Sequence, residues 1–452
     1  MKKNDIYILE AIDNGVNFEG ICKVDNFTIF VPGLIKGEIA KVKILKVNSS
    51  FAFGKIEEFI QKSEFREETQ CGSYKKCGGC EALHVEYTKT LDMKREMAIN
   101  TIKKQGIAFD FSNSLIYGMG NPLHYRNKVQ YPVRNINGEI SIGMFSKRSH
   151  NLVEINDCKI QDEIINEVAF FVFEQLKKYN FKGYDETNNT GDIKNIMVRR
   201  GIHTDEIMCV LVVTKKEIVN NKNWEIIVKN LVNEFANIKS VILNINENNT
   251  NVILSNENIC IYGINYIMDY IGDYVFKIGA NSFFQVNTIQ AETLYNVLKE
   301  KLELSQEDKL LDLYSGVGSI GIFLSDAVKE VFGIEIVQDA VNMAQDNIQM
   351  NNIENVKCIQ GDATEEIQKL EQTGTKFDIV VVDPPRKGLD KEGIEILKKI
   401  QSKQIGYVSC NVATLARDLK LLEEKYEICS IDFVDMFPFT GHVECVAVMC
   451  LK

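Results

Sequence analysis

The stretch Lys309-Leu310-Leu311-Asp312-Leu313-Tyr314-Ser315-Gly316-Val317-Gly318-Ser319-Ile320-Gly321 decides the fold. It opens as an apolar β-type run, passes through a glycine turn and continues as an apolar helical segment. Glycines at such a turn let the backbone approach a bound ligand closely. From about residue 275 onward the pattern is strictly β-then-α, which predicts a parallel sheet of the α/β class.

The residues around this turn distinguish between two kinds of cofactor. A G-x-G-x-x-G pattern that includes Gly316 also suits a dinucleotide. Asp312, however, precedes the glycines on the strand, where it would repel a pyrophosphate but assist a cationic sulfonium. Glu335 ends the next β-type run and is placed to accept both ribose hydroxyls. The pattern therefore favours S-adenosylmethionine over a nicotinamide or flavin.

A third segment, Asp383-Pro384-Pro385-Arg386, follows the apolar run 379–382. Two prolines at a strand end make a rigid wall that lacks hydrogen-bond donors. Enzymes that methylate exocyclic amino groups tend to place an aromatic residue after the prolines, so Arg386 counts against that chemistry. The bland alternative is an ordinary loop.

Cys410 follows the run 405–409, where an open α/β sheet presents its strand ends. A thiol there is a candidate nucleophile, and the alternative is a buried structural cysteine. Since a free thiol has a pKa of about 8.5, we expect a partly accessible, polar site that favours the thiolate. Downstream, Glu444 is the candidate base, with His442 as a competitor.

Four other cysteines have a spacing typical of a metal site. Cys71, Cys77 and Cys80 lie on a glycine-rich segment, and Cys158 is a plausible fourth ligand. The 3 + 1 arrangement favours an iron-sulfur cluster, because structural zinc more often uses two short paired knuckles. Zinc and the absence of any metal are the alternatives. A fourth cysteine ligand would close the site, which favours a structural or RNA-positioning role.

Composition indicates an ordinary globular protein without a membrane span. Of the 452 residues, 45% are hydrophobic and 25% charged, and no apolar run reaches about 18 residues. The first residues, Met1-Lys2-Lys3-Asn4-Asp5, have no signal-peptide core. We therefore expect a cytoplasmic protein whose cysteines are reduced, metal-bound or catalytic rather than paired.

One basic segment stands out against the net charge of -11. Residues 121–150 hold five basic residues and one acidic residue, interleaved with Tyr125, Tyr131 and Phe145. Local patches decide nucleic-acid binding, because salt screens distant charges. Basic residues among exposed aromatics suit RNA, although a solvated hairpin face would look similar. The predicted RNA contacts are Arg126, Lys128, Arg134, Lys147 and Arg148.

The chain is long enough for about three domains. Residues 1–62 alternate short β-type runs with turns, which predicts a small OB-like β-barrel. Residues 63–270 form a central mixed α/β domain that includes the cysteine segment and a helix over about 92–106. Residues 271–452 form the Rossmann-like α/β domain.

Together, these segments and Ser282-Phe283-Phe284-Gln285-Val286-Asn287 resemble the RNA uracil-5-methyltransferase family over essentially the whole chain. The similarity is to the iron-sulfur-containing type that methylates 23S ribosomal RNA. It implies that residues 1–62 are an RNA-binding TRAM barrel and that the helix near 92–106 packs on the catalytic domain. It also implies a 4Fe-4S cluster on the four cysteines and S-adenosylmethionine as cofactor, with Cys410 as nucleophile and Glu444 as base. The implied cofactor contacts are Gln285, Tyr314, Glu335 and Asp383.

The chemistry of uracil gives an independent reason for these residue types. C5 is too weakly nucleophilic to attack a sulfonium until a thiolate has added to C6, and its remaining proton must then be removed. Asp383 could orient the uracil edge as well as the cofactor amine. We expect ribosomal RNA as substrate, since relatives that act on the T-loop of transfer RNA frequently lack barrel and cluster. The alternative substrates are the T-loop of transfer RNA and a different pyrimidine, and the alternative methyl source is a folate-flavin pair. The alternative from another class is a non-catalytic RNA-binding or assembly protein. No obligate protein partner is inferred.

Overall fold

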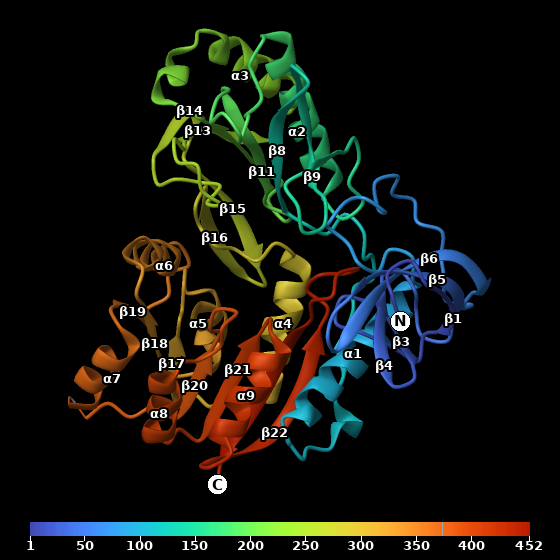
Figure 1. The fold of residues 1–452 in the computed structure, drawn as a ribbon. Helices are drawn as coiled ribbons and strands as arrows, with labels where there is room; N and C mark the ends of the chain where they lie inside the picture. Colours follow the sequence, from blue (N-terminus) through green and yellow to red (C-terminus); the bar gives the residue numbers. More distant parts are fainter. Residues whose placement is uncertain (373) are drawn as a thin grey trace.

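The computed structural model describes residues 1–372 and 374–452. Three large sheets occupy three regions of the molecule (Figure 1). The first strands form the blue region, the green strands lie in a second region, and the yellow-to-red part holds the third sheet. Among the described residues, no helix combines the length and apolar character that a membrane crossing requires. The domain boundaries after residues 62 and 270 stay predictions.

The N-terminal sheet has six strands in the order β1-β5-β6-β4-β3-β2. Strand β1 also contacts β3, so the sheet curls towards closure. Its inward positions carry small and branched apolar side chains such as Ile29, Val42 and Ala52. The strands are β1 (Ile6–Glu10), β2 (Asp13–Asn14), β3 (Gly20–Val24), β4 (Phe27–Val31), β5 (Ile39–Val47) and β6 (Phe51–Gln61).

The central sheet has seven strands in the order β10-β9-β8-β11-β12-β13-β14. Helices α2 and α3 bury their apolar faces against it around Trp224. A separate two-stranded ribbon, β15-β16, contacts β12 and β13. The elements are β8 (Lys128–Ile136), β9 (Glu139–Phe145), β10 (Leu152–Glu154), α2 (Glu163–Lys178), β11 (Ile193–Arg200), β12 (Ile207–Val213), α3 (Asn223–Glu234), β13 (Ile238–Ile245), β14 (Asn258–Gly263), β15 (Tyr266–Ile271) and β16 (Tyr274–Gly279).

The third sheet has eight strands in the order β19-β18-β17-β20-β21-β23-β22-β7. Strands β17 to β21 pair in parallel, whereas β23 is antiparallel to both β21 and β22. The elements are α1 (Tyr87–Lys104), β7 (Ile116–Tyr117), α4 (Thr288–Lys301), β17 (Lys309–Leu313), α5 (Ser319–Leu324), β18 (Glu330–Glu335), α6 (Gln338–Met350), β19 (Val356–Gln360), α7 (Ala363–Gln372), β20 (Ile379–Val382), α8 (Lys391–Ile400), β21 (Gln404–Ser409), α9 (Val412–Leu422), β22 (Tyr426–Val434) and β23 (Glu444–Leu451).

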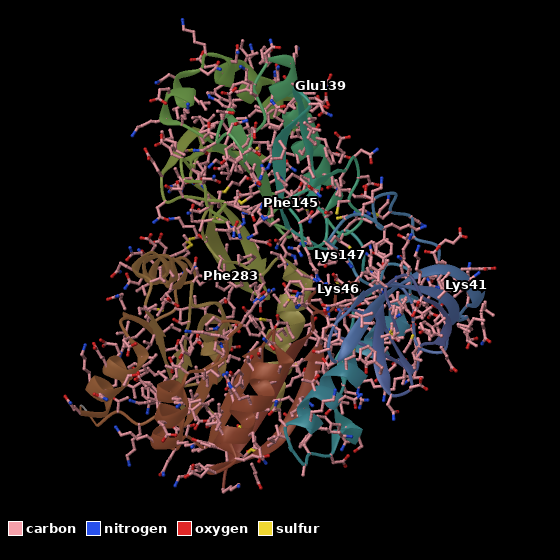
Figure 2. All side chains as sticks on the ribbon, in the orientation of Figure 1. Lys41, Lys46, Glu139, Phe145, Lys147 and Phe283 are labelled. Carbon is pink, nitrogen blue, oxygen red and sulfur yellow. A yellow bond between two sulfur atoms is a disulfide. The ribbon has the colours of Figure 1, made fainter. Side chains whose placement is uncertain are left out.

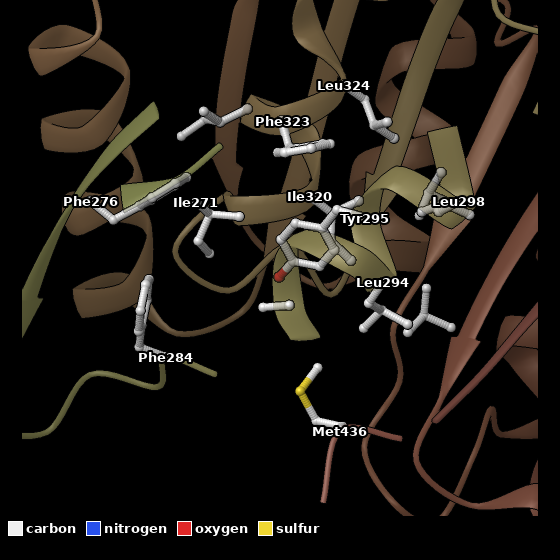
Figure 3. Packing of buried hydrophobic residues seen from close by; sticks show 14 of the residues in the cluster. Ile271, Phe276, Phe284, Leu294, Tyr295, Leu298, Ile320, Phe323, Leu324 and Met436 are labelled. Carbon is white, nitrogen blue, oxygen red and sulfur yellow. The ribbon is translucent and has the colours of Figure 1, made fainter. Parts of the chain in front are cut away.

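Alternate residues of these strands pack into two separate hydrophobic cores, one on each face, as expected for a sheet covered on both faces. In β17, Leu310 packs with α4 and α5, whereas Leu311 packs with α8 and α9. The first core also includes Phe276 and Phe284, whose ring centroids are 6.1 Å apart (Figure 3). The ribbon β15-β16 is therefore anchored to the eight-stranded sheet by the same apolar cluster.

Helix α1 precedes the central sheet in sequence but packs on the C-terminal sheet. Its residues Ala98, Ile99 and Ile102 belong to the core that contains α8 and α9, and α1 contacts both α9 and β7 (Figure 1). A fully buried ion pair joins Lys94 of α1 to Asp435, at 2.5 Å. Removing one partner of such a pair leaves an uncompensated buried charge, so the pair fixes where α1 sits.

One disulfide bond, between Cys429 of β22 and Cys450 of β23, links neighbouring strands. The expectation that no cysteine is paired was therefore wrong for these two residues. The prediction came from the expected compartment, and the sequence gives no sign that residues 21 positions apart face each other across a strand pair.

Candidate functional site

The carboxyl ends of three neighbouring strands bring polar residues to one edge of the catalytic sheet. Leu313 of β17 pairs with Ile334 of β18 and with Val382 of β20. Because these strands are parallel, the residues that follow lie side by side at the edge where open α/β sheets bind ligands. They are Tyr314, Glu335 and Asp383.

Cys410 and Glu444 come together because β21 and β23 are antiparallel. Ser409, the last residue of β21, pairs with Cys445 of β23. The pairing places Cys410, the next residue on one strand, beside Glu444, the preceding residue on the other. Cys410 is half-buried and Glu444 is 5% exposed. The candidate nucleophile and the candidate base therefore share one end of a strand pair.

A cavity of about 340 Å³ opens onto Cys410. Its wall comes from distant parts of the chain, including Asn17 of the barrel, Lys94 of α1 and His442 before β23. None of the four implied cofactor contacts lines it, namely Gln285, Tyr314, Glu335 and Asp383. The cavity wall therefore includes Cys410 but not the cofactor edge, and Asp383 of that edge is close enough to Cys410 for its charge to raise the pKa of the thiol.

The surroundings of Cys410 are polar, as expected, but they do not favour the thiolate. Burial, followed by the charges of Glu444 and Asp383, raises the pKa of the Cys410 thiol. Arg386 acts in the opposite direction, through its charge and a hydrogen bond to the thiol. The expectation of a thiolate-favouring site was wrong for this arrangement, because burial and then the two carboxyl groups raise the pKa of the thiol more than the guanidinium lowers it.

Three carboxyl groups at this edge hold their protons more tightly than in water. The pKa of Glu444 is raised to about 8, first by burial and then by Asp383, against the lowering effect of Arg386. Burial raises the pKa of Asp383 to about 7. Burial also raises the pKa of Asp312 to about 7, with Asp383 adding to it and the Gly321 amide opposing. Carboxyl groups with such pKa values can exchange protons near neutral pH.

The raised pKa of Glu444 makes the stability of the protein depend on pH. Between 4.5, its ordinary value, and about 8, the folded state binds a proton that the unfolded state has lost. Stability should therefore fall as pH rises through this window. We expect Glu444→Gln to flatten the fall in the thermal unfolding midpoint between pH 5 and pH 8. Exposed Glu427→Gln on β22 is the control, and equal slopes in both variants would contradict the pKa assignment.

The turn after Cys410 is tied to the Asp383-Pro384-Pro385-Arg386 loop by one side chain. Oδ1 of Asn411 accepts hydrogen bonds from the amides of Ala413 at 3.1 Å and Thr414 at 3.4 Å, which caps α9. Its Nδ2 donates to the carbonyl oxygen of Arg386 at 3.0 Å. Asn411 therefore fixes the guanidinium-bearing loop against the candidate nucleophile.

The glycine turn after β17 has the backbone geometry that a closely bound ligand needs. Gly316 and Gly318 have φ values of +55° and +78°, and no atom lies within 4 Å of where a Cβ on Gly316 would stand. Within the described part of the chain, Oδ1 of Asp312 and Oγ of Ser315 are buried without a hydrogen-bond partner. Unpartnered buried acceptors of this kind mark a place for a ligand.

Glu335 is held in position by backbone donors. Its two carboxylate oxygens accept from the amides of Gly316 at 3.0 Å and Val337 at 2.8 Å. The next residues, Ile336 and Val337, are 63% and 54% exposed and form an apolar surface beside the carboxylate. An acid next to an apolar surface suits a ribose and its attached base, so these residues fit S-adenosylmethionine.

Gln285 lies on the segment before α4, close to the same edge. The side-chain amide nitrogen of Asn127 donates to the backbone carbonyl oxygen of Gln285 at 2.9 Å. The side chain of Gln285 hydrogen-bonds to Tyr295. Two residues earlier, Phe283 is 69% exposed. An aromatic side chain that exposed is a candidate ligand contact, and composition alone did not single it out.

The four cysteines predicted as metal ligands meet in one place. Cys71, Cys77, Cys80 and Cys158 line a small cavity whose other walls include Leu83, Met144 and Ile160. The amide of Gly79 donates to Sγ of Cys77 at 3.3 Å. Within residues 1–372 and 374–452, however, no group of three or more His, Cys, Asp or Glu side chains is arranged to hold a metal ion. The sulfurs thus surround a hollow without converging on a single point.

Only part of the basic segment 121–150 is open to solvent. Lys147 and Arg148 are exposed, whereas Arg126 and Lys128 are half-buried. Burial, followed by Arg199 and Arg126, lowers the pKa of Lys128 to about 7. Lys128 is therefore a weaker phosphate ligand at neutral pH than an exposed lysine.

Other side chains of this segment have partners within the protein, and the RNA contacts stay predictions. Arg134 forms an ion pair with Glu186 at 2.7 Å. The expectation of exposed aromatic side chains was wrong for Tyr125 and Tyr131, which are 5% and 0% exposed. Tyr131 faces inward on β8, and its hydroxyl donates to Asn166 at 2.7 Å. Alternation along a strand buries every second residue, which charge counting does not register.

Several residues that shape the cavity carry no sequence signal. Lys94 and Glu81 lie more than 300 residues before Cys410, and only the fold brings them to its wall. The amides of Glu81 and Ala82 donate to the carbonyl oxygen of Phe439 at 2.8 Å and 3.0 Å. The cysteine segment is therefore hydrogen-bonded to the loop that leads to Glu444.

Comparison with known proteins gives the family. A family model described as tRNA (uracil-5-)-methyltransferase matches residues 86–452, and a TRAM domain model matches residues 13–56. An uncharacterized RNA methyltransferase of Clostridium acetobutylicum is 42% identical over 453 residues, covering 99% of this chain and 98% of its own. One of Oceanobacillus iheyensis is 42% identical over 454 residues, covering 100% and 98%.

Among solved structures, the tRNA (uracil-54, C5)-methyltransferase of Pyrococcus abyssi in complex with S-adenosyl-L-homocysteine has the same fold. Its TM-score is 0.78 at 24% identity, and the match covers 98% of this chain and 99% of that one. The C-terminal part thus has the α/β methyltransferase fold behind an N-terminal TRAM domain built from strands. The chain belongs to the tRNA (uracil-5-)-methyltransferase family and is an RNA (uracil-5)-methyltransferase.

Proposed function

We propose that the protein methylates C5 of a uridine in RNA by covalent catalysis, with Cys410 as nucleophile and Glu444 as base. The observation that carries the proposal is the pairing of β21 with β23, which places these two residues together. The cavity on the Cys410 side accepts a uridine that has left its stack, at a cost of a few kcal/mol. Asp383, whose charge reaches Cys410, is placed to orient the uracil.

Each step assigns a bond change to a residue of this chain. Sγ of Cys410, as thiolate, adds to C6 of uracil, and the electron pair of the C5–C6 double bond moves towards C5, which takes the methyl group. Glu444 then removes the proton left on C5. The double bond re-forms as the C6–S bond breaks, and the thiolate of Cys410 leaves. Arg386 lowers the pKa of both the Cys410 thiol and the Glu444 carboxyl group, and it offsets their negative charge during these steps.

The cofactor we propose is S-adenosylmethionine, bound at the edge formed by Gln285, Tyr314, Glu335 and Asp383, with Asp312 and Gly316 beneath it. When bound, it supplies the methyl group as an electrophile. Glu335 would hold the ribose hydroxyls, and Ile336 and Val337 the flat base. The unpartnered Oδ1 of Asp312 and the open space over Gly316 support this placement.

For the substrate we propose 23S ribosomal RNA, with the T-loop of transfer RNA as the alternative. A protein named as a transfer RNA enzyme shares the whole fold, so the barrel does not by itself distinguish the two. Methylation of separate ribosomal and transfer RNA pools, with products mapped to single nucleotides, tests the choice. We expect 5-methyluridine in 23S RNA; product confined to transfer RNA would overturn the substrate, and none in either pool would overturn the function.

We further propose that Cys71, Cys77, Cys80 and Cys158 hold a 4Fe-4S cluster. Four thiolates around one apolar hollow match the ligand set of such a cluster, in which each iron takes a separate cysteine. A single zinc ion would instead need all four sulfurs about 2.3 Å from one point. The Gly79 amide hydrogen bond to Cys77 is also of the kind that tunes cluster sulfurs.

Protein purified without oxygen should therefore be brown and contain iron. We expect visible absorbance that is lost in Cys80→Ser, because removing one of four ligands opens the cluster. Cys260→Ser, which changes an exposed thiol outside the cavity, should keep the absorbance. Iron and sulfide analysis checks the stoichiometry. Colourless protein that contains zinc would contradict the proposal.

A further inference from the structure

Three phenylalanines form an aromatic surface on the outside of the TRAM barrel. Phe30 of β4 pairs with Phe53 of β6, and Phe51 precedes Phe53 by two residues on the same face. Their ring centroids are 5.5 to 6.0 Å apart. All three are half-buried, whereas the alternate residues Ile29 and Ala52 point into the barrel core. The rings therefore do not belong to the core, and the fold of the barrel alone does not require them.

Two cations lie next to this aromatic surface. Lys46 of β5 pairs with Phe53 and is exposed. The guanidinium of Arg148, from the loop between β9 and β10, lies over the Phe53 ring at 5.6 Å from its centroid. In the part of the chain that the structure describes, neither cation has a carboxylate partner within ion-pair distance. Arg148 also has a φ of +58°, an uncommon backbone conformation for a non-glycine residue.

Neighbouring contacts through Arg148 and Lys147 link the aromatic surface to the wall of the cavity at Cys410. Lys147, next to Arg148, lies 3.6 Å from Glu81, and Glu81 lines the cavity that opens onto Cys410. Figure 2 shows Lys46 and Lys147 at the junction of the barrel and the central sheet. Asn17 of the barrel also lines this cavity. A chain that leaves the cavity along this wall thus meets the cations and then the phenylalanines.

We propose that Phe30, Phe51 and Phe53, with Arg148, form a stacking site for an unpaired base of the RNA that flanks the target uridine. Lys46 and Lys147 would hold the adjoining phosphates. Aromatic rings next to cations suit single-stranded RNA, because every base has a face that stacks and every nucleotide carries a phosphate. The inference rests on the proposed function, which supplies RNA as the ligand.

The test compares RNA affinity and methylation kinetics of the full-length protein with those of Phe53→Ala. Loss of one stacked base weakens binding by about 5- to 150-fold in other proteins. We expect Kd and KM for the RNA pool that the wild type methylates to rise at least about fivefold, with kcat at saturating RNA unchanged. Phe53→Trp should restore binding, because tryptophan also stacks. Ile8→Ala, which removes a 69% exposed side chain elsewhere on the barrel, is the matched control.

The outcomes separate this site from the proposed function. Unchanged Kd in Phe53→Ala, or an equal loss in Ile8→Ala, would overturn the stacking site while leaving methylation intact. A lower melting temperature of Phe53→Ala with unchanged Kd would also overturn it, since the rings would then only pack against the Arg148 loop. If the wild type binds RNA but methylates no uridine, the proposed function fails, and the Kd comparison on bound RNA still decides the stacking site.

Discussion

Replacing Cys410 with alanine is expected to abolish methyl transfer while leaving cofactor binding nearly unchanged. Without a sulfur to add to C6, C5 of uracil is not nucleophilic enough to accept the methyl group. Loss of a covalent nucleophile costs roughly 10⁶-fold in other enzymes, so turnover should fall below detection. The cofactor edge at Tyr314 and Glu335 lies outside the cavity that Cys410 faces, so its affinity should change little. Calorimetric titration with the cofactor, beside a methylation assay, measures both quantities.

The matched control is Cys260→Ala, which removes an exposed thiol on β14. It should retain wild-type turnover, because β14 belongs to the central sheet and Cys260 does not line the cavity at Cys410. Methylation that persists in Cys410→Ala would remove the thiol from the mechanism. Loss of cofactor binding in the same variant would show a structural role instead.

Replacing Glu444 with glutamine is expected to trap the RNA on the enzyme. Cys410 can still add to C6 and the methyl group can still reach C5, but the remaining proton has no base to accept it. Elimination of the thiolate then stalls, and a methylated RNA–protein adduct should accumulate. General-base catalysis typically contributes about 10²- to 10⁴-fold, so turnover should fall by at least that factor. Denaturing electrophoresis of labelled RNA detects the adduct.

His442 provides the necessary comparison, since it lines the same cavity and was the competing base. Burial, followed by Arg386, Lys94 and Arg126, lowers its pKa, which favours the neutral imidazole but makes it a weaker proton acceptor than a free histidine. We expect His442→Ala to form product without accumulating adduct. The reverse pattern, with adduct in His442→Ala and normal turnover in Glu444→Gln, would assign the base to His442.

The sequence predicted, for a physical reason, that the residues after the apolar runs lie together at one edge of the sheet; their contact with a cofactor stays a prediction. In a parallel sheet the carboxyl ends of consecutive strands meet at one edge, so residues that follow apolar runs, such as Asp383 and Glu335, must lie near each other. Periodicity alone could not predict that Cys410 lies beside Glu444, because β23 runs antiparallel and its place in the sheet order cannot be read from the sequence pattern. The resemblance to a family supplied that relation in advance.

Other features depend on contacts that no local pattern encodes. The raised pKa of Cys410 follows first from burial and then from the charges of Glu444 and Asp383, and three different strands bring these groups together. Lys94 reaches the cavity because α1 leaves its neighbours in sequence and packs on the distant sheet. Tyr131 looked like an RNA contact by composition, yet the alternation of β8 buries it.

Peptide mapping of an adduct with RNA that contains 5-fluorouridine tests the covalent mechanism most directly. Fluorine at C5 cannot be removed as a proton, so a reaction that passes through addition at C6 stops after methyl transfer. With S-adenosylmethionine present, we expect a stable RNA adduct on the peptide that contains Cys410, and none in Cys410→Ala. An adduct on another residue, or turnover of normal RNA with no adduct on fluorinated RNA, would contradict attack by Cys410.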